Sequence, residues 1–313
     1  MPAEPGGHAG SRLADVHVVV ASNPHARFGR SGPVGERVVQ VLRAAGHEVV
    51  HRTAPDFAAL QRAARAAAER ADALVVVGGD GMVHLGVNAV GGTSTPLAIV
   101  PAGSGNDFAT EIGMPDVDSS IAGLAALLET EPVRCDLIRI RHPDGETFAA
   151  GIVSVGFDAD VNVRSFRMTR VPARMRYQAA IVATLASLRH RTFRIRIDGG
   201  EERTWRTVIA AIANHRVFGG GIPIAPTAST VDGRLTGILA DELTRPQFLG
   251  LLAKALKGRH LGDPRVHVED IGTVTIACDD QTVLACADGE IVGRLPVECS
   301  VAVGALRVFG TPR

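Results

Sequence analysis

The architecture of this chain follows from Leu74-Val-Val-Val-Gly-Gly-Asp-Gly81 and Leu97-Ala-Ile-Val-Pro-Ala-Gly-Ser-Gly-Asn-Asp-Phe-Ala109. Each stretch begins as a run of β-forming residues, reaches glycines and a carboxylate, and continues as a plausible helix. Glycines allow a tight turn and a close ligand approach, and the first N–H groups of the helix attract an anion. Two such turns in one small unit indicate a phosphate-binding site at the carboxyl end of a parallel sheet.

The surrounding sequence has the alternation that a parallel sheet needs. Short buried strands alternate with amphipathic or alanine-rich helical segments, which is the pattern of a doubly wound α/β domain. Ligands of such sheets bind beyond the carboxyl ends of the strands, where both glycine turns fall. We expect strands at 16–21, 48–52, 74–77 and 97–100, and helices at 33–45, 55–70, 82–90, 107–112 and 119–129.

The pattern changes near residue 132, after which short strands separated by turns predominate. They predict a mainly antiparallel β-domain, a sandwich or a barrel, and we take the sandwich as the expected fold. The predicted organisation is therefore a disordered tail over 1–12, an α/β domain over 13–132 and a β-rich domain over 133–313. The expected strands are 133–141, 147–155, 191–197, 205–213, 235–240, 266–268, 273–277, 283–285, 297–303 and 305–309, the last returning to the first domain, with helices at 174–189 and 245–257.

Composition and charge limit the function classes. The net formal charge is +0, so no overall field draws the protein to nucleic acid or to a membrane. Aromatic residues for base stacking are scarce, which argues against nucleic-acid binding. The 4 cysteines show no Cys-x-x-Cys spacing and are expected to be reduced and buried. No secretory signal or membrane span is recognisable, so we expect a cytoplasmic protein.

Several common nucleotide and hydrolase motifs are absent from the sequence. It contains no G-x-x-x-x-G-K-[ST], no protein-kinase catalytic set, no H-E-x-x-H and no G-x-S-x-G. The run Gly103-Ser-Gly-Asn-Asp-Phe108 fails as a dinucleotide fingerprint, because Phe108 stands at the third glycine position.

The motifs that are present are Gly78-Gly-Asp-Gly81, Pro101–Ala109, Val155-Gly-Phe-Asp-Ala159, Phe218-Gly-Gly-Gly221, Ile224-Ala-Pro226, Val231-Asp-Gly-Arg-Leu235 and Asp288-Gly-Glu290. Together they resemble those of the diacylglycerol kinase catalytic family, which includes sphingosine kinases and soluble bacterial diacylglycerol kinases. The resemblance makes 13–132 the nucleotide-binding domain and 133–313 the lipid-substrate domain. The resemblance covers about residues 16–310 in family order. It implies an ATP- and Mg²⁺-dependent lipid kinase that phosphorylates the hydroxyl of diacylglycerol to give phosphatidic acid, with sphingoid or ceramide-like alcohols as alternative acceptors.

The resemblance also implies a nucleotide site and a magnesium-binding carboxylate. Asp80 would bind Mg²⁺ through water, although it could instead be a turn carboxylate that caps the next helix. For Asp107, a helix cap and a metal or substrate contact are both open. The positions implied to contact the nucleotide are Asn23, Arg27, Thr53, Gly78, Gly79, Gly81, Met82, Ser104 and Asn106.

Glu290 is the predicted catalytic base. A lipid hydroxyl is too weak an acid to attack ATP unaided, so a carboxylate must accept its proton as the new bond to phosphorus forms. By resemblance this role falls to the acidic residue that ends Asp288-Gly-Glu290. The same tripeptide also reads as a two-residue hairpin turn, with Glu290 starting the next strand. Both interpretations can hold together.

A second, structural Mg²⁺ site is implied at the turn around Asp232, with Ser229 and Arg234 contributing to it; an ordinary Asp-Gly turn is the alternative. Asp136 matches a family aspartate that supports the magnesium–water network, unless it simply pairs with a neighbouring arginine.

The chain also departs from the family. Met82, His84 and Leu85 replace the usual Thr and Asn-Glu, and Val231 and Thr236 stand where acidic residues are common.

These departures leave a nucleotide-binding regulatory protein without turnover as a rival hypothesis, and NAD kinases share the general layout. His84 itself could make a polar contact or lie on a helix surface.

Between Val161 and Ile197 there is no acidic residue, while arginines recur from Arg164 to Arg196. This basic region beside an apolar helix suits peripheral association with the anionic inner face of a membrane, unless the helix only packs on the β-domain. A homodimer is left open.

Overall fold

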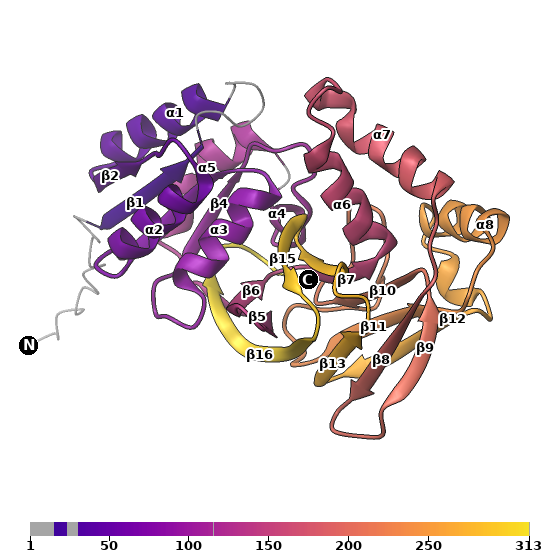
Figure 1. The fold of residues 1–313 in the computed structure, drawn as a ribbon. Coiled ribbons are helices and arrows are strands. Elements are labelled where there is room, and N and C mark those ends of the chain that lie inside the picture. The colour runs from indigo at the N-terminus through magenta and orange to yellow at the C-terminus, as the bar shows by residue number, and fades with distance from the viewer. Residues whose placement is uncertain (1–15, 24–30, 115, 313) are drawn as a thin grey trace, which may run out of the picture.

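The computed structural model describes residues 16–23, 31–114 and 116–312 of the chain. It consists of two lobes that lie side by side (Figure 1). The first lobe is built on four parallel strands in the order β2-β1-β3-β4. These strands are β1 (His17–Ser22), β2 (Glu48–Arg52), β3 (Ala73–Gly78) and β4 (Leu97–Pro101).

Helices cover both faces of this parallel sheet, so the predicted doubly wound architecture is confirmed. Side chains alternate along each strand: Val75 and Val77 of β3 face one helix layer, while Leu74 and Val76 face the other. The first layer is α1 (Ser31–Ala44) with α5 (Val117–Leu128), and the second is α2 (Phe57–Ala68) with α3 (Asp80–Val90). The short helix α4 (Asp107–Glu111) follows β4.

One long strand, β16 (Val297–Val308), connects the lobes (Figure 1). Its end pairs in parallel with β4, Val308 opposite Leu97, and its length pairs antiparallel with β5 (Val133–His142) and β13 (Thr273–Cys278). A 10-stranded sheet therefore runs through both lobes. The strands β6 (Gly145–Ala149), β8 (Arg191–Ile197) and β9 (Arg203–Thr207) complete it.

A second, 6-stranded sheet lies only in the second lobe, in the order β12-β11-β10-β7-β14-β15, and all of its pairings are antiparallel. Its core is shared with the antiparallel part of the first sheet: Ile138 and Phe193 from one sheet meet Val155 and Ile212 from the other. The predicted β-sandwich is thus confirmed. The strands are β7 (Ile152–Gly156), β10 (Ile209–Ala213), β11 (Leu235–Ala240), β12 (Val266–Ile271), β14 (Leu284–Ala287) and β15 (Glu290–Arg294).

Four predicted strands are divided or joined in the structure. The single strand expected at 147–155 is two strands, β6 and β7, because the N–H groups of Ala150 and Gly151 are donated to the Asp288 carboxylate rather than to a ladder. The strand expected at 205–213 is likewise divided into β9 and β10. The strands expected at 297–303 and 305–309 form one strand, β16, with a register shift around Gly304, where φ is 58°.

Three helices cover the outer face of the second sheet: α6 (Phe157–Arg167), α7 (Ala173–Ala186) and α8 (Arg245–Ala255). The helix α6 was missed by the sequence analysis, which expected only two helices in this half. Phe157 and Val161 of α6 and Phe248 of α8 share a buried cluster. Within the described residues, no helix has the length and apolar character to span a bilayer. All four cysteines are buried and none is in a disulfide.

Candidate active site

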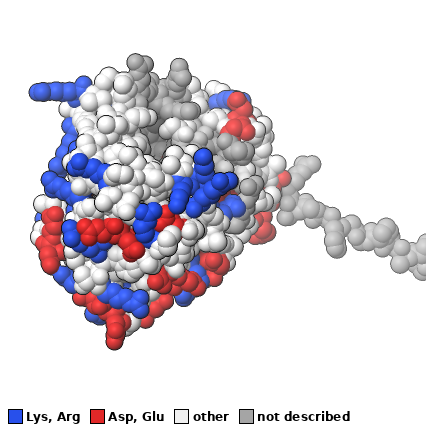
Figure 2. Space-filling model, turned by 90° about the vertical axis from the view of Figure 1, so that its right-hand side faces the viewer, with Lys and Arg blue, Asp and Glu red and all other residues white. Residues whose placement is uncertain are grey.

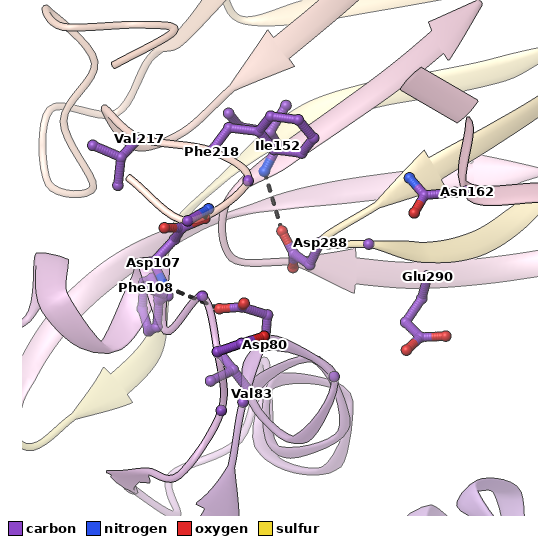
Figure 3. A pocket seen from close by; sticks show the side chains of 18 of the residues that line it. Asp80, Val83, Asp107, Phe108, Ile152, Asn162, Val217, Phe218, Asp288 and Glu290 are labelled. Carbon is purple, nitrogen blue, oxygen red and sulfur yellow. Dashed lines mark hydrogen bonds between the residues drawn. The ribbon is translucent and has the colours of Figure 1, made fainter. Parts of the chain in front are cut away.

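A cavity of about 930 Å³ opens between the two lobes. The first lobe contributes the turn after β3 and the loop after β4, both at the carboxyl ends of parallel strands. The second lobe contributes the hairpin between β14 and β15, the helices α6 and α7, and a loop after β10 (Figures 1 and 3). The two glycine turns predicted to bind phosphate are therefore at the cavity, and Gly79, Asp80, Gly81 and Ser104 line it.

The two glycine turns pack directly against each other. A Cβ placed on Gly103 would lie 2.2 Å from Gly79 Cα, and one on Gly79 would lie 2.8 Å from Gly103 Cα. A Cβ on Gly105 would lie 2.4 Å from an Asp80 carboxylate oxygen. These glycines are thus needed for the contact between two backbone segments, a requirement that exists before any ligand binds.

Asp80 stabilises the start of the neighbouring helix. Its carboxylate accepts hydrogen bonds from the N–H groups of Asn106 and Asp107, at 3.2 and 3.0 Å, at the beginning of α4. Burial, and then the negative charge of Asp107, raise the pKa of Asp80 above its ordinary value. Asp80 therefore does cap a helix, as one interpretation of the sequence expected. The capped helix is α4, however, and not α3, which begins at Asp80 itself.

Asp107 joins the lobes. Its carboxylate, on a residue only 9% exposed, accepts hydrogen bonds from the N–H groups of Gly220 and Gly221 in the second lobe, at 3.0 and 2.8 Å. The carboxylate therefore does not cap its own helix, whereas a metal or substrate contact of this cavity-lining residue stays a prediction. Asp107 fixes the glycine loop of the second lobe against the phosphate side of the cavity.

Several predicted nucleotide contacts do not line the cavity. The Asn106 amide closes its own loop on the Gly103 backbone, at 2.9 and 3.1 Å. The Met82 side chain is 4% exposed in the first-lobe core, and its N–H is donated to the Gly79 carbonyl. Gly78, Asn23 and Thr53 lie at strand ends on the same edge of the sheet without lining the cavity. Arg27 lies outside the described residues.

Asp288 forms the predicted hairpin turn between β14 and β15. Asp288 and Gly289 have φ of 51° and 84°, and Ala287 pairs with Glu290. The carboxylate of Asp288 accepts three backbone N–H groups, those of residues 150–152, at 2.8 to 3.1 Å. Burial acts to raise the pKa of Asp288, but the contact with His84 and these N–H groups hold it below its ordinary value.

Glu290 stands apart from the other carboxylates of the cavity. Asp80, Asp107 and Asp288 each use both oxygens to accept backbone N–H groups, whereas the Glu290 carboxylate has no hydrogen bond or ion pair with any described residue. It lines the cavity and lies against the start of α3, where a Cβ on Gly81 would be 3.1 Å from its Oε1 (Figure 3). A carboxylate without a partner in a shared cavity is available to accept a proton.

The structure adds cavity residues that the sequence analysis did not single out. Asn162 from α6, Tyr177 and Gln178 from α7, and His215 from the loop after β10 line the wall opposite the phosphate turns. None belongs to a glycine turn or an acidic motif, so no local pattern marks them. His84 is buried at 8% exposure and faces Asp288, so the interpretation as a helix-surface histidine is wrong.

The turn predicted to hold a structural Mg²⁺ lies away from the cavity. The Asp232 carboxylate accepts the Arg234 N–H at 3.0 Å, and the Ser229 hydroxyl accepts the Val231 N–H at 3.3 Å. Buried Asp136 accepts the Gly233 and Gly304 N–H groups, both at 2.7 Å, rather than pairing with an arginine. These contacts suit an ordinary Asp-Gly turn, and no set of three His, Cys, Asp or Glu side chains suited to a metal ion occurs among the described residues.

A buried acid lies behind the cavity wall. Asp158, at 6% exposure in α6, accepts a 2.6 Å hydrogen bond from the Ser154 hydroxyl. Burial raises the pKa of Asp158 to about 6, despite this hydrogen bond. Because the folded state holds this proton more tightly than the unfolded chain, the contribution of Asp158 to stability is present at acid pH. It is lost as the pH rises from 3.8 through about 6.

Asp158→Asn is therefore expected to gain stability relative to wild type as the pH rises. The difference in unfolding free energy between the two proteins should move by about 2–3 kcal/mol in favour of the variant between about pH 4 and pH 7. Urea unfolding of both proteins at the two pH values measures it. A pH-independent difference would show that Asp158 has an ordinary pKa.

Comparison with known proteins agrees with this fold. Residues 17–140 match the model for a diacylglycerol kinase catalytic domain, and residues 151–310 match a YegS C-terminal NAD kinase beta sandwich-like domain. A diacylglycerol kinase of Mycobacterium tuberculosis is 35% identical over 93% of this chain and 94% of its own length. One from Bacillus subtilis is 25% identical over 84% and 86%.

Solved structures place the fold in a wider class. A diacylglycerol kinase structure from Bacillus anthracis superposes with a TM-score of 0.68 at 18% identity, over 95% of this chain and 97% of the other. An NAD kinase from Archaeoglobus fulgidus in complex with ATP gives a TM-score of 0.52 at 15% identity, over 95% and 94%. The architecture is thus that of the NAD kinase-like proteins with two lobes. Within that class, the chain belongs to the diacylglycerol kinase family of lipid kinases.

Proposed function

We propose that this protein is an ATP- and Mg²⁺-dependent kinase that transfers the γ-phosphoryl group of ATP to the hydroxyl of diacylglycerol, giving phosphatidic acid and ADP. The observation that carries the proposal is the free carboxylate of Glu290 beside the phosphate turns. Glu290 takes the hydroxyl proton while the lipid oxygen bonds to the γ-phosphorus and the bond to the β,γ-bridging oxygen breaks.

The first lobe supplies the donor side. The backbone of the turns at Gly79–Gly81 and Gly103–Gly105 lines the cavity. Glycine turns of this kind allow the phosphates of a nucleotide to approach the backbone closely. Mg²⁺ is commonly held by one or two carboxylates together with the phosphates of the nucleotide, without a full set of protein ligands. Asp80 lines the cavity and is therefore suited to bind Mg²⁺. When bound, Mg²⁺ would neutralise phosphate charge. The other carboxylates hold the cavity walls in place.

The second lobe supplies the acceptor side. Ile152, Val217 and Phe218 give the cavity wall an apolar surface, and Asn162 adds a polar group (Figure 3). Tyr177 also lines the cavity and adds a hydroxyl group. An apolar wall with few polar groups suits the glycerol end of a lipid better than a second nucleotide. Ceramide-like and sphingoid alcohols share this chemistry and are the alternative acceptors.

The proposal is tested by a panel of acceptors with labelled ATP and Mg²⁺. In mixed micelles, diacylglycerol should receive label at a higher rate than ceramide, sphingosine or NAD. A higher rate with a sphingoid alcohol would change the acceptor, and a higher rate with NAD would change the enzyme class. Tight ATP binding without any product would support the nucleotide-binding regulatory protein instead.

We further propose that the protein meets its lipid at the anionic inner face of the cytoplasmic membrane, through the exposed side of α6 and α7. Phe166, Met175 and Val182 are 54%, 54% and 68% exposed there. Figure 2 shows an uncharged area on this side of the molecule with Lys and Arg side chains along its border, most acidic side chains lying below. Exposed Arg167 and Arg170 have no ion pair among the described residues.

Not every arginine of the predicted basic region is available. Arg191 pairs with Asp160 at 2.7 Å, and Arg194 and Arg196 pair with acidic side chains on neighbouring turns. The double variant Arg167→Ala/Arg170→Ala should therefore weaken binding to vesicles rich in anionic lipid about 30-fold, at about 1 kcal/mol for each arginine. The matched control is Arg194→Ala/Arg196→Ala, which should bind as wild type in cosedimentation. Equal losses in both pairs would exclude this docking face.

A further inference from the structure

His84 is the departure from the family pattern that the proposed reaction does not explain. It lies in α3, three residues after Gly81 and on the face of the helix that meets the β14–β15 hairpin. The hairpin touches this face at two points: Glu290 beside Gly81, and Asp288 beside His84. The helix that begins with the phosphate turn is thus in contact with the hairpin that carries the proposed base.

The surroundings of His84 fix the direction of its ring. The neighbouring Asn88 uses its Oδ1 to accept from Thr147 and Phe148, at 2.7 and 2.8 Å, so its NH₂ group must face His84. That group lies 3.3 Å from His84 Nε2. The Asn88 amide donates its hydrogens to the carbonyls of His84 and Phe148, both at 2.9 Å, and its nitrogen accepts no hydrogen bond, so a proton on Nε2 would find no acceptor there. The ring proton is therefore placed on Nδ1, which faces Asp288.

The contact between His84 and Asp288 is electrostatic and buried. Nδ1 lies 3.7 Å from Asp288 Oδ2, beyond hydrogen-bond length, and the two side chains are 10% and 9% exposed. At low local dielectric, an N–H dipole aimed at a carboxylate retains much of its strength. Asp288 in turn holds residues 150–152, so its position sets where the hairpin leaves the sheet.

We propose that His84 is a positioning residue for phosphoryl transfer: through Asp288 it fixes the hairpin that carries Glu290 relative to the phosphate turn at the start of α3. The proposal rests on the proposed function, since it assigns Glu290 to the acceptor hydroxyl. His84 does not line the cavity, so we expect it to contact neither substrate. Its contribution should therefore appear in the rate of transfer and not in nucleotide affinity.

The test compares His84→Leu with His84→Asn. An asparagine can place its Nδ2 where the histidine has Nδ1 and so keeps a donor toward Asp288, whereas leucine has none. Because small displacements of reacting groups are costly, kcat of His84→Leu should fall at least about tenfold, with KM for ATP within about twofold. His84→Asn should recover kcat to within about threefold of wild type.

The matched control is His260→Asn. His260 is also a buried histidine, 2% exposed, but its Nε2 contacts the Ile224 carbonyl at 2.7 Å outside the cavity. This variant should lose thermal stability and keep kcat when measured well below its unfolding temperature. If kcat of His84→Leu equals that of His260→Asn at matched fractions of folded protein, His84 is only a core residue and the proposal is wrong.

Amide hydrogen exchange separates this inference from the proposed function. In His84→Leu, the N–H groups of residues 150–152 and of the hairpin at 288–290 should exchange several-fold faster than in wild type, while those of β3 stay unchanged. Hydrogen exchange is measured without catalysis. It therefore tests whether His84 fixes the hairpin even if no lipid is phosphorylated. Unchanged exchange in the hairpin would overturn the proposal whatever the kinase assay gives.

Discussion

Replacement of Glu290 by glutamine is expected to lower kcat for phosphoryl transfer about 10³-fold, with the dissociation constant for ATP within about twofold of wild type. Glutamine keeps the size and polarity of the side chain but cannot take the hydroxyl proton. The Glu290 carboxylate has no hydrogen bond or ion pair with any described residue, so its replacement breaks no such side-chain contact. The variant should therefore lose rate and keep its affinity for ATP. Steady-state assays measure kcat, and calorimetric titration measures the dissociation constant for ATP.

Glu298→Gln is the matched control for this variant. Glu298 is a glutamate of the same lobe on β16, where it pairs with Arg141 at 3.0 Å outside the cavity. Its replacement removes a carboxylate without touching the site, and kcat should not change. A Glu290→Gln enzyme with kcat near wild type would remove Glu290 from the role of base, even if the protein proved to be a kinase.

Gly103→Ala is expected to have the largest effect on the folded protein. The added Cβ would lie 2.2 Å from Gly79 Cα, a backbone atom that cannot move without displacing the other phosphate turn. Overpacking of this kind typically costs about 1–3 kcal/mol, and we expect the upper end because both contacting segments are backbone. ATP affinity should fall with it, since both turns face the cavity.

The control for Gly103→Ala is Gly123→Ala in the exposed middle of α5. No atom lies within 4 Å of a Cβ placed there, so the variant should gain about 0.5–1 kcal/mol from helix propensity. Chemical unfolding and ATP titration of both variants measure the contrast. If Gly103→Ala is as stable as wild type and binds ATP normally, the two turns do not need their close contact.

The sequence was informative where local chemistry and periodicity coincide. Buried runs such as 74–77 alternate with amphipathic helices, and glycines end the strands, so the doubly wound sheet and its phosphate-binding edge could be predicted. Elements that depend on distant side chains could not. The division between β6 and β7 arises because Asp288 takes the N–H groups of residues 150–152, a contact across 136 to 138 positions of the chain.

The candidate site shows the same limit. Glycine turns and Glu290 were predicted from motifs, and they do line the cavity. Met82 was predicted to contact the nucleotide from its place in the motif alone, but helical periodicity turns its side chain into the core. Asn162 and His215 come from segments without a motif, and only the packing of the second lobe brings them to the cavity. The assignment of metal to Ser229, Asp232 and Arg234 stays a prediction.

The most direct test of the central claim is transfer of labelled γ-phosphate from ATP to diacylglycerol, in anionic mixed micelles with Mg²⁺, measured side by side for wild type and Glu290→Gln. We expect labelled phosphatidic acid from wild type and about 10³-fold less from the variant at equal ATP occupancy. Equal product from both proteins, or no labelled lipid from a wild-type protein that binds ATP, would contradict the account.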